Sequence, residues 1–517
     1  MIGELIDKAI APFFPKTALT RMHARSVIMA FEAAKPTRTH KAKKQTGSAD
    51  RALNNTLKSM REQSRNLDEN HDIVTGVFDR LEERVVGGSG IAVEPIPLRL
   101  DGTVHREFAA AINSLWGEWS LKPEASGELS RPQMERLVCR SWLRDGEALA
   151  QELMGRVPNY QHLHGVPYAL ELLEADYLPI EYTDESKGIV QGIERNGWRR
   201  VLAYHLYKSH PAGLRGSLVQ NTKRVPAEQV IHIAYRKRIG QSRGQPLLHA
   251  VLIRLADIKD YEESERVAAR ISAALAMYIK KGTPDDYVPA GPGETRAERT
   301  FPIAPGVVVD TLLPGEDVGM IESNRPNPFL EGFRNGQLKA VAAGTRSTYS
   351  SVARSYDGTY SAQRQELVEG QLGYDQLQHE FIDYWCRRVY RNWLRMAILS
   401  GQLRVPHDVD PRTIYGAFYQ GPVMPWINPV HEADAWERII KAGGGDEAEM
   451  ARSRGRNPSE LKASRKSEIA ANRADELVFS SDAYHEYYGR NQPNAKAKEK
   501  GKTGIPGATG GDDGDDT

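Results

Sequence analysis

Apolar residues recur at helical spacing over long stretches of this 517-residue chain. The spacing predicts helices over residues 50–86, 131–154, 246–281, 328–343 and 360–399. In 246–281 the helical period holds over more than thirty positions, which is about three times the mean length of a helix in globular proteins. The middle of that stretch is densely charged. We therefore expect this helix to span a distance rather than only to fill a core.

Between residues 168 and 234 the apolar pattern changes to short runs that predict an antiparallel sheet. Asn196-Gly197 separates two of these runs and is a strong signal for a tight hairpin turn. A further strand is predicted over 90–100, and two more bracket 415–429. Residues 283–325 are rich in Pro and Gly with brief apolar runs, so we expect a small β-rich insert between two helices. Together these patterns predict an α+β chain.

The stretch 336–364 interrupts two strong helices with Gly, Ser, Thr and Tyr. It carries Arg346 and Arg354 but a single acid, Asp357. A polar, cationic and flexible connection of this kind is typical of a segment that touches something mobile. The composition is equally compatible with a frayed surface connection that has no function. Both interpretations stay open on the residues themselves.

Composition narrows the class of protein. The chain has 69 Lys and Arg residues against 68 Asp and Glu residues, a formal net charge of +1. This balance argues against a surface coated in positive charge for tight nucleic-acid binding. The two cysteines, Cys139 and Cys386, cannot form a disulfide framework and suit a reducing compartment. No run of about 18 apolar residues occurs, so no membrane span is expected.

The two ends of the chain differ from its middle. Five basic side chains crowd into residues 35–44 without an acid. A solvated, partly disordered arm is the simpler interpretation of this segment, and contact with nucleic acid is the alternative. From residue 495 the sequence is of low complexity, and we expect it to be disordered.

One motif points to catalysis. Residues 240–244 match the G-x-S-x-G pattern of a hydrolase nucleophile elbow, with Ser242 as the nucleophile. A true elbow places the serine directly at the end of a strand, whereas three basic residues, 236–238, intervene here. An ordinary glycine-rich turn that opens a helix is the preferred interpretation, and no catalytic residue is predicted.

Two other patterns resemble ligand sites. His162 and His164 are spaced to lie on one face of a strand, but no third metal ligand is suitably placed. Gly501-Lys502-Thr503 resembles the end of a phosphate-binding loop, yet Lys496 stands where that loop needs its first glycine. We therefore predict neither a metal nor a cofactor.

The order of segments resembles the portal proteins of tailed bacteriophages, of the lambda-like family, over about residues 64–460. Three motifs carry the resemblance. The R-G-x-P-L entry to a stem helix appears as Arg243, Gly244, Pro246 and Leu247, and the W-I-N-P-x-x-E-A block that opens the crown helices appears as Trp426, Ile427, Asn428, Pro429, Glu432 and Ala433. The tunnel-loop pattern is followed at Tyr349, Ser355, Tyr356, Tyr360 and Ser361, while Thr345-Arg346 replaces the usual apolar pair and Val352 takes the place of a leucine.

The resemblance implies a portal fold with an α/β wing, a helical stem and crown and a small β-rich clip, in a subunit that forms rings. The implied regions are an N-terminal arm (1–50), the wing (51–242), the first stem helix (243–281), the clip (282–326), the second stem helix (327–343), the tunnel loop (344–361), a long helix with the wing's return (362–425), the crown helices (426–494) and a disordered tail (495–517).

The same resemblance implies a function. About twelve copies are expected to form a ring at one capsid vertex, assembled in the host cytoplasm, as a conduit for double-stranded DNA in packaging and ejection. The implied partners are the terminase large subunit, which would hydrolyse ATP, the major capsid protein, a scaffold protein and a head-completion adaptor. The chain itself is expected to have no enzyme activity. The competing interpretations are a serine hydrolase that uses Ser242 and a helical scaffold that forms no ring.

The tunnel loop is where we expect DNA to pass. Residues 331–364 carry five basic side chains against two acids, a net charge of +3 per copy. Weak contacts that ignore base sequence suit a duplex that must slide. The candidate DNA-facing residues are Lys339, Arg346, Tyr349, Arg354, Tyr356 and Arg364.

Overall fold

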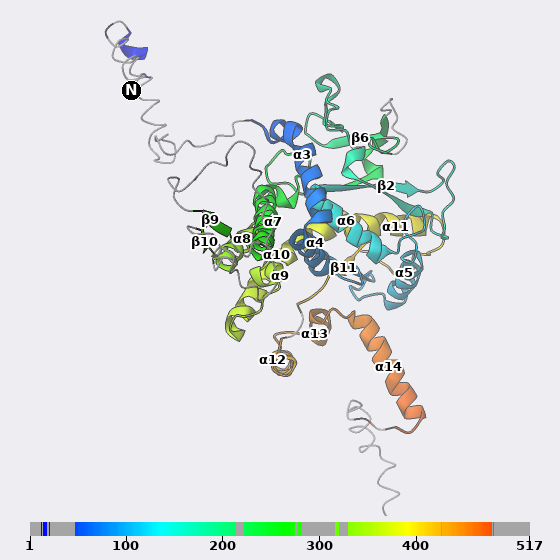
Figure 1. Ribbon diagram of the computed structural model, residues 1–517. Coiled ribbons are helices and arrows are strands. Elements are labelled where there is room, and N and C mark those ends of the chain that lie inside the picture. Colours follow the sequence, from blue (N-terminus) through cyan, green and yellow to red (C-terminus); the bar gives the residue numbers. More distant parts are fainter. Residues whose placement is uncertain are drawn as a thin grey trace, which may run out of the picture.

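A computed structural model describes most of the chain, as a body of helices packed on sheets from which further helices extend (Figure 1). The described residues are 12, 14–17, 20, 47–213, 222–274, 278–281, 316–319, 329–424, 427–477 and 479, with the backbone alone described for 271–274, 278–281 and 316–319. The basic segment 35–44 and the tail from 495 lie outside this part. None of the helices in the described part is both long and apolar enough to cross a membrane.

Four helices form one side of the body: α3 (Ala49–Asn70), α4 (Asp72–Val85), α5 (Arg106–Trp119) and α6 (Arg131–Asp145). One helix was predicted over 50–86, but the structure has two helices there, α3 and α4, with a single residue between them. His71 is extended, with φ −129° and ψ 111°, and it separates α3 from α4. Its buried imidazole Nε2 lies 3.2 Å from the carbonyl oxygen of Leu255. The break therefore places a polar side chain that joins this helix pair to a distant part of the chain.

The central sheet has β2 (Glu147–Met154) between β3 (Tyr168–Leu173) and β8 (Val230–Ala234), all antiparallel. A helix over 131–154 was predicted, and its second half is wrong, because α6 ends at Gly146 in a left-handed conformation (φ 88°). The segment EALAQELM has apolar residues that suit either structure. Pairing with two neighbours makes it a strand that is buried on both faces.

A second antiparallel sheet has the order β4 (Ile189–Val190), β5 (Ile193–Arg195), β6 (Val201–Tyr207) and β7 (Thr222–Pro226). The hairpin predicted at Asn196-Gly197 is confirmed between β5 and β6, with a register shift next to Arg195. Short 3₁₀ turns complete this region at Ala175–Tyr177, Glu185–Lys187 and Ala227–Gln229.

The predicted helix over 360–399 is confirmed as one continuous rod. It consists of α10 (Tyr360–Phe381), a π turn (Ile382–Cys386) and α11 (Arg387–Leu399). Trp385 and Trp393 are fully buried on it, and Trp393 packs edge-on against Trp116 of α5. Beyond the rod, β11 (Ala417–Gln420) pairs with β1 (Ala92–Pro95). The strand predicted over 90–100 thus forms, but within the described part of 415–429 β11 is the single strand.

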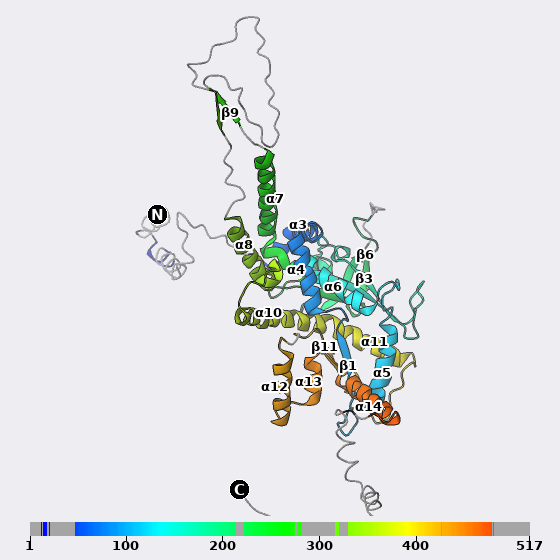
Figure 2. The ribbon, with the colours of Figure 1, turned by 60° about the horizontal axis from the view of Figure 1, so that its bottom comes forward.

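The densely charged helix predicted over 246–281 is shorter than predicted at both ends. A 3₁₀ turn (Leu247–Ala250) precedes α7 (Leu252–Ala274), and residues 278–281 form β9 (Tyr278–Lys281) instead of helix. β9 pairs with β10 (Glu316–Gly319), in agreement with a β-rich insert, the rest of which lies outside the described residues. The chain returns through α8 (Leu330–Thr345). Figure 2 shows α7 extending away from the body beside α8.

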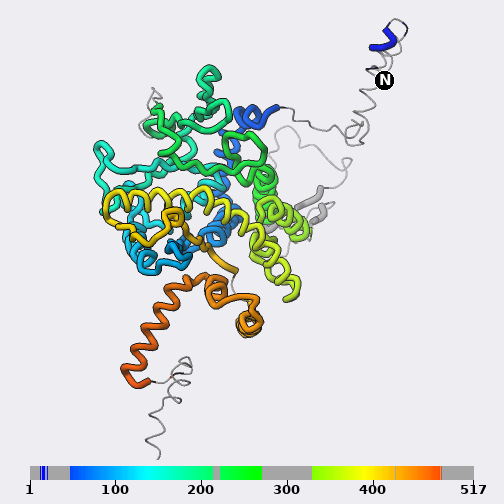
Figure 3. The backbone as a smooth tube through the Cα atoms, turned by 180° about the vertical axis from the view of Figure 1, so that it is seen from behind, coloured from blue at the N-terminus to red at the C-terminus, as the bar shows by residue number. Residues whose placement is uncertain are grey.

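Three further helices lie on the other side of the molecule from α7: α12 (Pro429–Lys441), α13 (Glu447–Ser453) and α14 (Pro458–Ala474) (Figures 2 and 3). Each begins at an Asn or Asp that accepts a hydrogen bond from its first turn. Apart from Ala451, no residue of these three helices is buried. In the described part of the chain, the apolar side chains of these helices are thus exposed or only partly covered.

Candidate functional site

The predicted loop at 344–361 contains a short helix between two longer ones. α8 ends at Arg346 and the short helix α9 (Tyr349–Ala353) ends at Arg354, both in the left-handed conformation with φ of 58° and 53°. Thr348 caps the start of α9 and Thr359 the start of α10, each through its hydroxyl. Flexibility was inferred from composition, and these threonine caps are the signal that this inference missed.

α9 is fastened to the neighbouring rod. The backbone N–H of Ser350 donates to Glu366 Oε1 on α10 at 2.9 Å, and the Ser350 hydroxyl donates to the same carboxylate. Val352 is buried beneath the turn. A Cβ on Gly370 of α10 would lie only 2.4 Å from Thr348 Cγ2, so the turn rests directly on this glycine. The cationic segment is therefore held in a fixed position between α8 and α10.

The six candidate DNA-facing residues divide into two groups. Arg346 and Tyr349 are half-buried, and the exposed residues are Lys339, Arg354, Tyr356 and Arg364. Lys339 Nζ lies 5.4 Å from the ring centre of Tyr349, which joins α8 to α9. Arg346 Nη1 donates to Gln376 Oε1 at 2.9 Å, and its guanidinium lies 5.8 Å from the ring centre of Tyr235. Arg346 is thus anchored on α10 and on the segment that follows β8.

The other arginines of the segment make no such anchor. Arg354 and Arg364 present exposed guanidinium groups at the end of α9 and in the first turns of α10. Tyr356 lies between them, 57% exposed, and its backbone carbonyl accepts a hydrogen bond from Gln363. The segment thus offers mobile cationic side chains and an exposed aromatic ring on a fixed backbone.

The base of α7 is built on a buried ion pair. Arg243, the first residue of the R-G motif, is fully buried and its guanidinium forms several hydrogen bonds with Glu147 of β2. Arg61 Nη2 reaches the same carboxylate at 2.9 Å, and His232 Nε2 lies 3.0 Å from it. The N–H of Gly244 donates to Glu147 Oε2 at 3.1 Å. One carboxylate thus joins α3, β2, β8 and the entry to α7.

This carboxylate is held ionised. Burial would raise the pKa of Glu147, but Arg243, His232 and Arg61 together lower it well below its ordinary value. Burial lowers the pKa of His232 in spite of Glu147, so its imidazole is neutral at pH 7. Residues Arg61, Glu147 and His232 were not predicted from the sequence. The one available signal was an acid, Glu147, inside an otherwise apolar strand.

Close contact between two backbone segments explains why Gly244, the second residue of the same motif, is a glycine. A Cβ on Gly244 would lie 1.9 Å from the carbonyl oxygen of Gly146, and a Cβ on Gly146 would lie 2.3 Å from the backbone of Gln245. The two backbones therefore cross in direct contact where the chain leaves the sheet for α7. Only two glycines permit this crossing.

Ser242 does not have the surroundings of a catalytic nucleophile. Its hydroxyl donates to Asp50 Oδ2 at 2.9 Å, and its N–H donates to Asp50 Oδ1 at 2.7 Å. The side chain is buried, and no histidine partner occurs for it in the part of the chain described. The serine therefore fastens the start of α3 to the turn at 240–244.

The two candidate metal ligands are separated in the structure. His162 Nε2 lies 2.7 Å from the carbonyl oxygen of Gly155, and His164 Nε2 lies 3.1 Å from that of Lys122. Each imidazole is thus engaged with a different piece of backbone, as expected for a pair of surface histidines.

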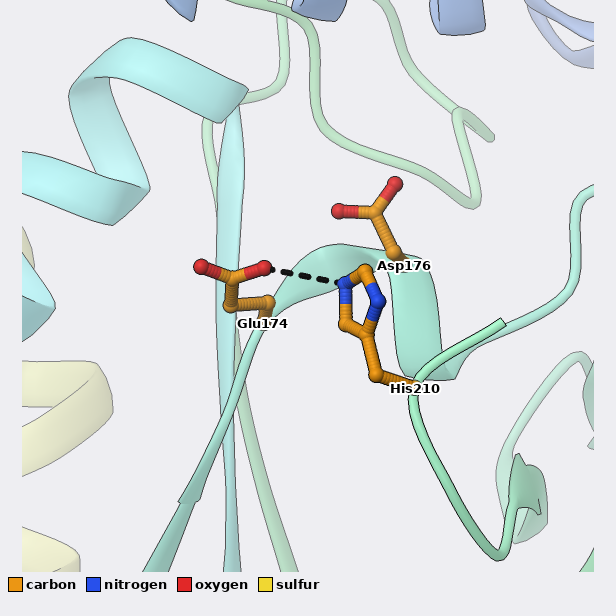
Figure 4. A group of neighbouring side chains, drawn as sticks. All are labelled: Glu174, Asp176 and His210. Carbon is orange, nitrogen blue, oxygen red and sulfur yellow. Dashed lines mark hydrogen bonds and ion pairs between the residues drawn. The ribbon is translucent and has the colours of Figure 1, made fainter. Parts of the chain in front are cut away.

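Another group of possible metal ligands, Glu174, Asp176 and His210, comes together near the 3₁₀ turn that follows β3 (Figure 4). His210 Nε2 lies 3.1 Å from Glu174 Oε2. Arg65 pairs with Asp176 and lies 3.9 Å from Glu174, and Arg61 lies 3.5 Å from Asp176. Because two guanidinium groups already neutralise these carboxylates, the arrangement fits an ion-pair network rather than a metal centre.

The W-I-N-P-x-x-E block has a capping role at the start of α12. Asn428 Oδ1 accepts a hydrogen bond from the N–H of His431, and Pro429 occupies the first turn. Glu432 Oε1 accepts from the N–H of Ile427 at 3.0 Å. Two side chains, Asn428 and Glu432, thus accept backbone hydrogen bonds at the start of α12. Trp426 lies outside the described residues.

A family model described as "Phage portal protein, lambda family" matches residues 35–378, which include the three-stranded and four-stranded sheets, α7, α8 and α9. The chain belongs to this family. The portal protein predicted from the sequence is thereby confirmed, as is its α+β class, and as a portal protein the chain is a component of the phage particle.

Relatives of this portal protein are distant. The chain is 22% identical over 450 residues to the probable portal protein of Halomonas phage phiHAP-1, covering 83% of this chain and 84% of that one. Among solved structures it is similar to a chain from the neck of a native gene transfer agent particle computed with C12 symmetry (14% identity, 76% of this chain, 92% of that chain, TM-score 0.42). A further match is the HK97 family phage portal protein from Corynebacterium diphtheriae (17% identity, 62% and 85% coverage, TM-score 0.25).

Proposed function

We propose that this portal protein assembles into a ring of about twelve copies and conducts double-stranded DNA through the opening of that ring during packaging and ejection. The observation that carries the proposal is the family match, which runs without a break from the wing through α7 and α8 to α10.

The proposed regions follow the elements. Residues 51–242 form the wing, and α7 and α8 are the helical parts of the stem, within 243–281 and 327–343. The insert 282–326 is the clip, where β9 and β10 form its base. α12, α13 and α14 belong to the crown, 426–494. α7 and the crown helices lie on opposite sides of the body, as an element on each side of a shell requires (Figure 2).

The predicted tunnel loop, 344–361, is the proposed DNA-facing loop, and its central part is the turn at 346–359. A duplex carries one negative charge per about 1.7 Å, so a rigid and highly charged collar would retard it. Fixing the backbone of α9 while Arg354 and Arg364 stay exposed gives weak contacts that move with the phosphates. Repetition around a ring multiplies this small local charge, although the net charge of the whole chain is only +1.

The further partners are proposals of the same kind. The terminase large subunit is expected to bind at the clip during packaging, and a head-completion adaptor to bind there afterwards. The major capsid protein and a scaffold protein are expected to surround the wing in the host cytoplasm, where assembly takes place. Since ATP hydrolysis belongs to the terminase, the portal needs no catalytic site.

The loop is tested by replacing Arg346 and Arg354 together with alanine in the phage. Both positions are left-handed, and because arginine and alanine each carry a Cβ, the backbone cost is the same. We expect rings to form normally, and the packaged genome to be shortened or lost. The length and yield of packaged DNA measure the effect. Lysine at both positions retains the charge and is expected to restore much of the packaging.

A matched control removes Arg395 and Arg404, two exposed arginines on α11 and after it. This control should package DNA as the wild type does. A normal genome length and normal retention in the Arg346→Ala/Arg354→Ala phage would contradict the proposed loop, though not the family.

A further inference from the structure

A second cationic surface lies away from α9. It consists of the β5–β6 turn, 195–200, and the segment after β8, 236–240. We call it the basic hairpin surface. Its eleven residues include no acid, and its cations are Arg195, Arg199, Arg200, Arg236, Lys237 and Arg238. All of these except the half-buried Arg195 are exposed. Figures 1 and 3 show the hairpin that leads into β6 on the side of the body where α3 begins.

The two segments are in direct contact. Arg199 Nη1 lies 3.0 Å from the position that a Cβ on Gly240 would occupy. Arg195 Nη1 donates to the carbonyl oxygen of Arg199 at 2.8 Å. Burial lowers the pKa of Arg195, and the positive charges of Arg236 and Arg199 lower it further. Positive charges are therefore held close together here although they repel one another. We take this unfavourable arrangement as a sign that the surface has a function.

Two acids, Glu194 and Asp50, act on this surface or on its neighbours. Glu194 precedes it on β5, but Arg224 holds that carboxylate through two hydrogen bonds at 2.8 and 2.9 Å. The pKa of Glu194 is accordingly lowered, by Arg224 first of all, to about 2. Asp50 accepts both hydrogen bonds from Ser242. Burial lowers the pKa of Arg195 and the charge of Asp50 acts to raise it, so one acid stands close to a surface that carries six cations and no acid of its own.

Exposed apolar groups accompany the charge. Trp198 at the turn is 93% exposed and Ile239 is fully exposed. A tryptophan between arginines offers a face for stacking as well as guanidinium groups for phosphates. The surface also continues in two directions. Lys237 and Arg346 lie 4.9 and 5.8 Å from the same Tyr235 ring, and Arg238 Nη2 donates to the carbonyl oxygen of Gly47, three residues after the basic segment 35–44.

We propose that the basic hairpin surface is a second site for double-stranded DNA, formed by other residues than the loop at 346–359 and indifferent to base sequence. A duplex fits better than an acidic peptide, because the cations are spread over two segments of the chain. Five of the six are arginines, whose forked guanidinium groups match phosphate oxygens. The site goes beyond the proposed conduit, since DNA in a channel need not touch it.

The test measures binding of a short fluorescein-labelled duplex to the purified full-length protein over a range of salt concentrations. The variant Arg199→Ala/Arg200→Ala/Arg236→Ala removes three exposed guanidinium groups. Each phosphate contact contributes about 0.9 to the slope of log K against log salt, so we expect the slope to fall by about 2 to 3. The matched control is Arg106→Ala/Arg395→Ala/Arg404→Ala, three exposed arginines elsewhere, whose slope should equal that of the wild type.

Two further measurements keep the result unambiguous. The variant Arg346→Ala/Arg354→Ala is measured beside the triple variant. If the two sites are separate, the decreases in slope that the two variants cause should add in the combined variant. An unchanged slope in the triple variant, with a reduced one in the loop variant, would overturn the second site and leave the conduit intact. Poly-glutamate that binds the surface more tightly than the duplex does would also overturn it, in favour of an acidic protein partner.

Discussion

At the scale of single residues, Glu147 has the largest structural consequence. It is fully buried and faces two guanidinium groups and one neutral imidazole. Buried ion pairs contribute little net stability, but the loss of one partner leaves uncompensated charge in the interior. The cluster matters for geometry rather than for stability. It fixes the place where the backbones at Gly146 and Gly244 cross and from which α7 departs.

Replacing Glu147 with glutamine is expected to lower the free energy of unfolding by about 3 to 5 kcal/mol, because Arg61 and Arg243 stay buried without a counter-charge. Urea denaturation of the full-length protein measures the change. Glu228→Gln, at an exposed position, should shift stability by no more than about 0.5 kcal/mol. Equal effects of the two variants would contradict the buried cluster.

His232 makes stability depend on pH. Burial lowers its pKa below the ordinary 6.5, although Glu147 opposes this and Arg236 and Arg243 assist it. The unfolded chain therefore binds the proton more readily. The contribution of this residue is complete above pH 6.5 and decreases as pH falls toward the folded pKa, by at most about 1.4 kcal/mol per pH unit.

The measurement is the unfolding midpoint of the wild type and of His232→Gln on both sides of pH 6.5. The variant should lose part of the pH dependence, whereas His407→Gln, at an exposed position, should keep all of it. A steeper dependence in His232→Gln would show that the imidazole is charged in the folded protein.

Residues that act through distant partners were beyond sequence reasoning. Arg243 was singled out through a family motif, but its partner Glu147 lies 96 positions away, and Arg61 and His232 come from two further elements. Structure that depends on residues close together in the sequence could be predicted, as the hairpin at Asn196-Gly197 shows. Ser242 matched a catalytic motif because a tight glycine turn and a nucleophile elbow share the same letters.

At the scale of elements, the turn α9 depends on one glycine. A Cβ on Gly370 would lie 2.4 Å from Thr348 Cγ2, within the interior of α10. Alanine is favoured over glycine inside a helix by up to about 1 kcal/mol, but here the overpacking is expected to cost about 1 to 3 kcal/mol. We expect Gly370→Ala to loosen α9.

Amide hydrogen exchange at Ser350 and Ser351 measures this loosening, which should accelerate exchange in Gly370→Ala. Adding Thr348→Ser removes Cγ2 but keeps the capping hydroxyl, so it should restore protection. Gly332→Ala in α8, with nothing within 4 Å of the added Cβ, should stabilise that helix slightly. Unchanged exchange in Gly370→Ala would mean that α9 does not rest on α10.

Whether a segment forms a helix or a strand could be predicted from the sequence where its apolar periodicity extends over many residues. The rod 360–399 was predicted correctly because its apolar period is sustained through the π turn. β2 was mistaken for helix because a strand buried on both faces loses its alternation. The end of α7 was missed because the pairing of β9 with β10 joins residues 35 or more positions apart.

At the scale of the whole molecule, the chain is asymmetric in a way that suits a ring. α7 extends from one side and α12, α13 and α14 from the other (Figure 2). α7 keeps exposed Ile253 and Val267, and α12 keeps exposed Val430 and Ile439. Different faces with unburied apolar groups are what head-to-tail contacts in a closed ring require.

The central claim is that copies of this chain enclose a channel, and electron microscopy of the purified full-length protein tests it most directly. The account predicts closed rings of about twelve copies with a central opening, and the turn at 346–359 lining that opening. Particles that stay monomeric and globular at every concentration, or assemblies without a hole, would contradict it.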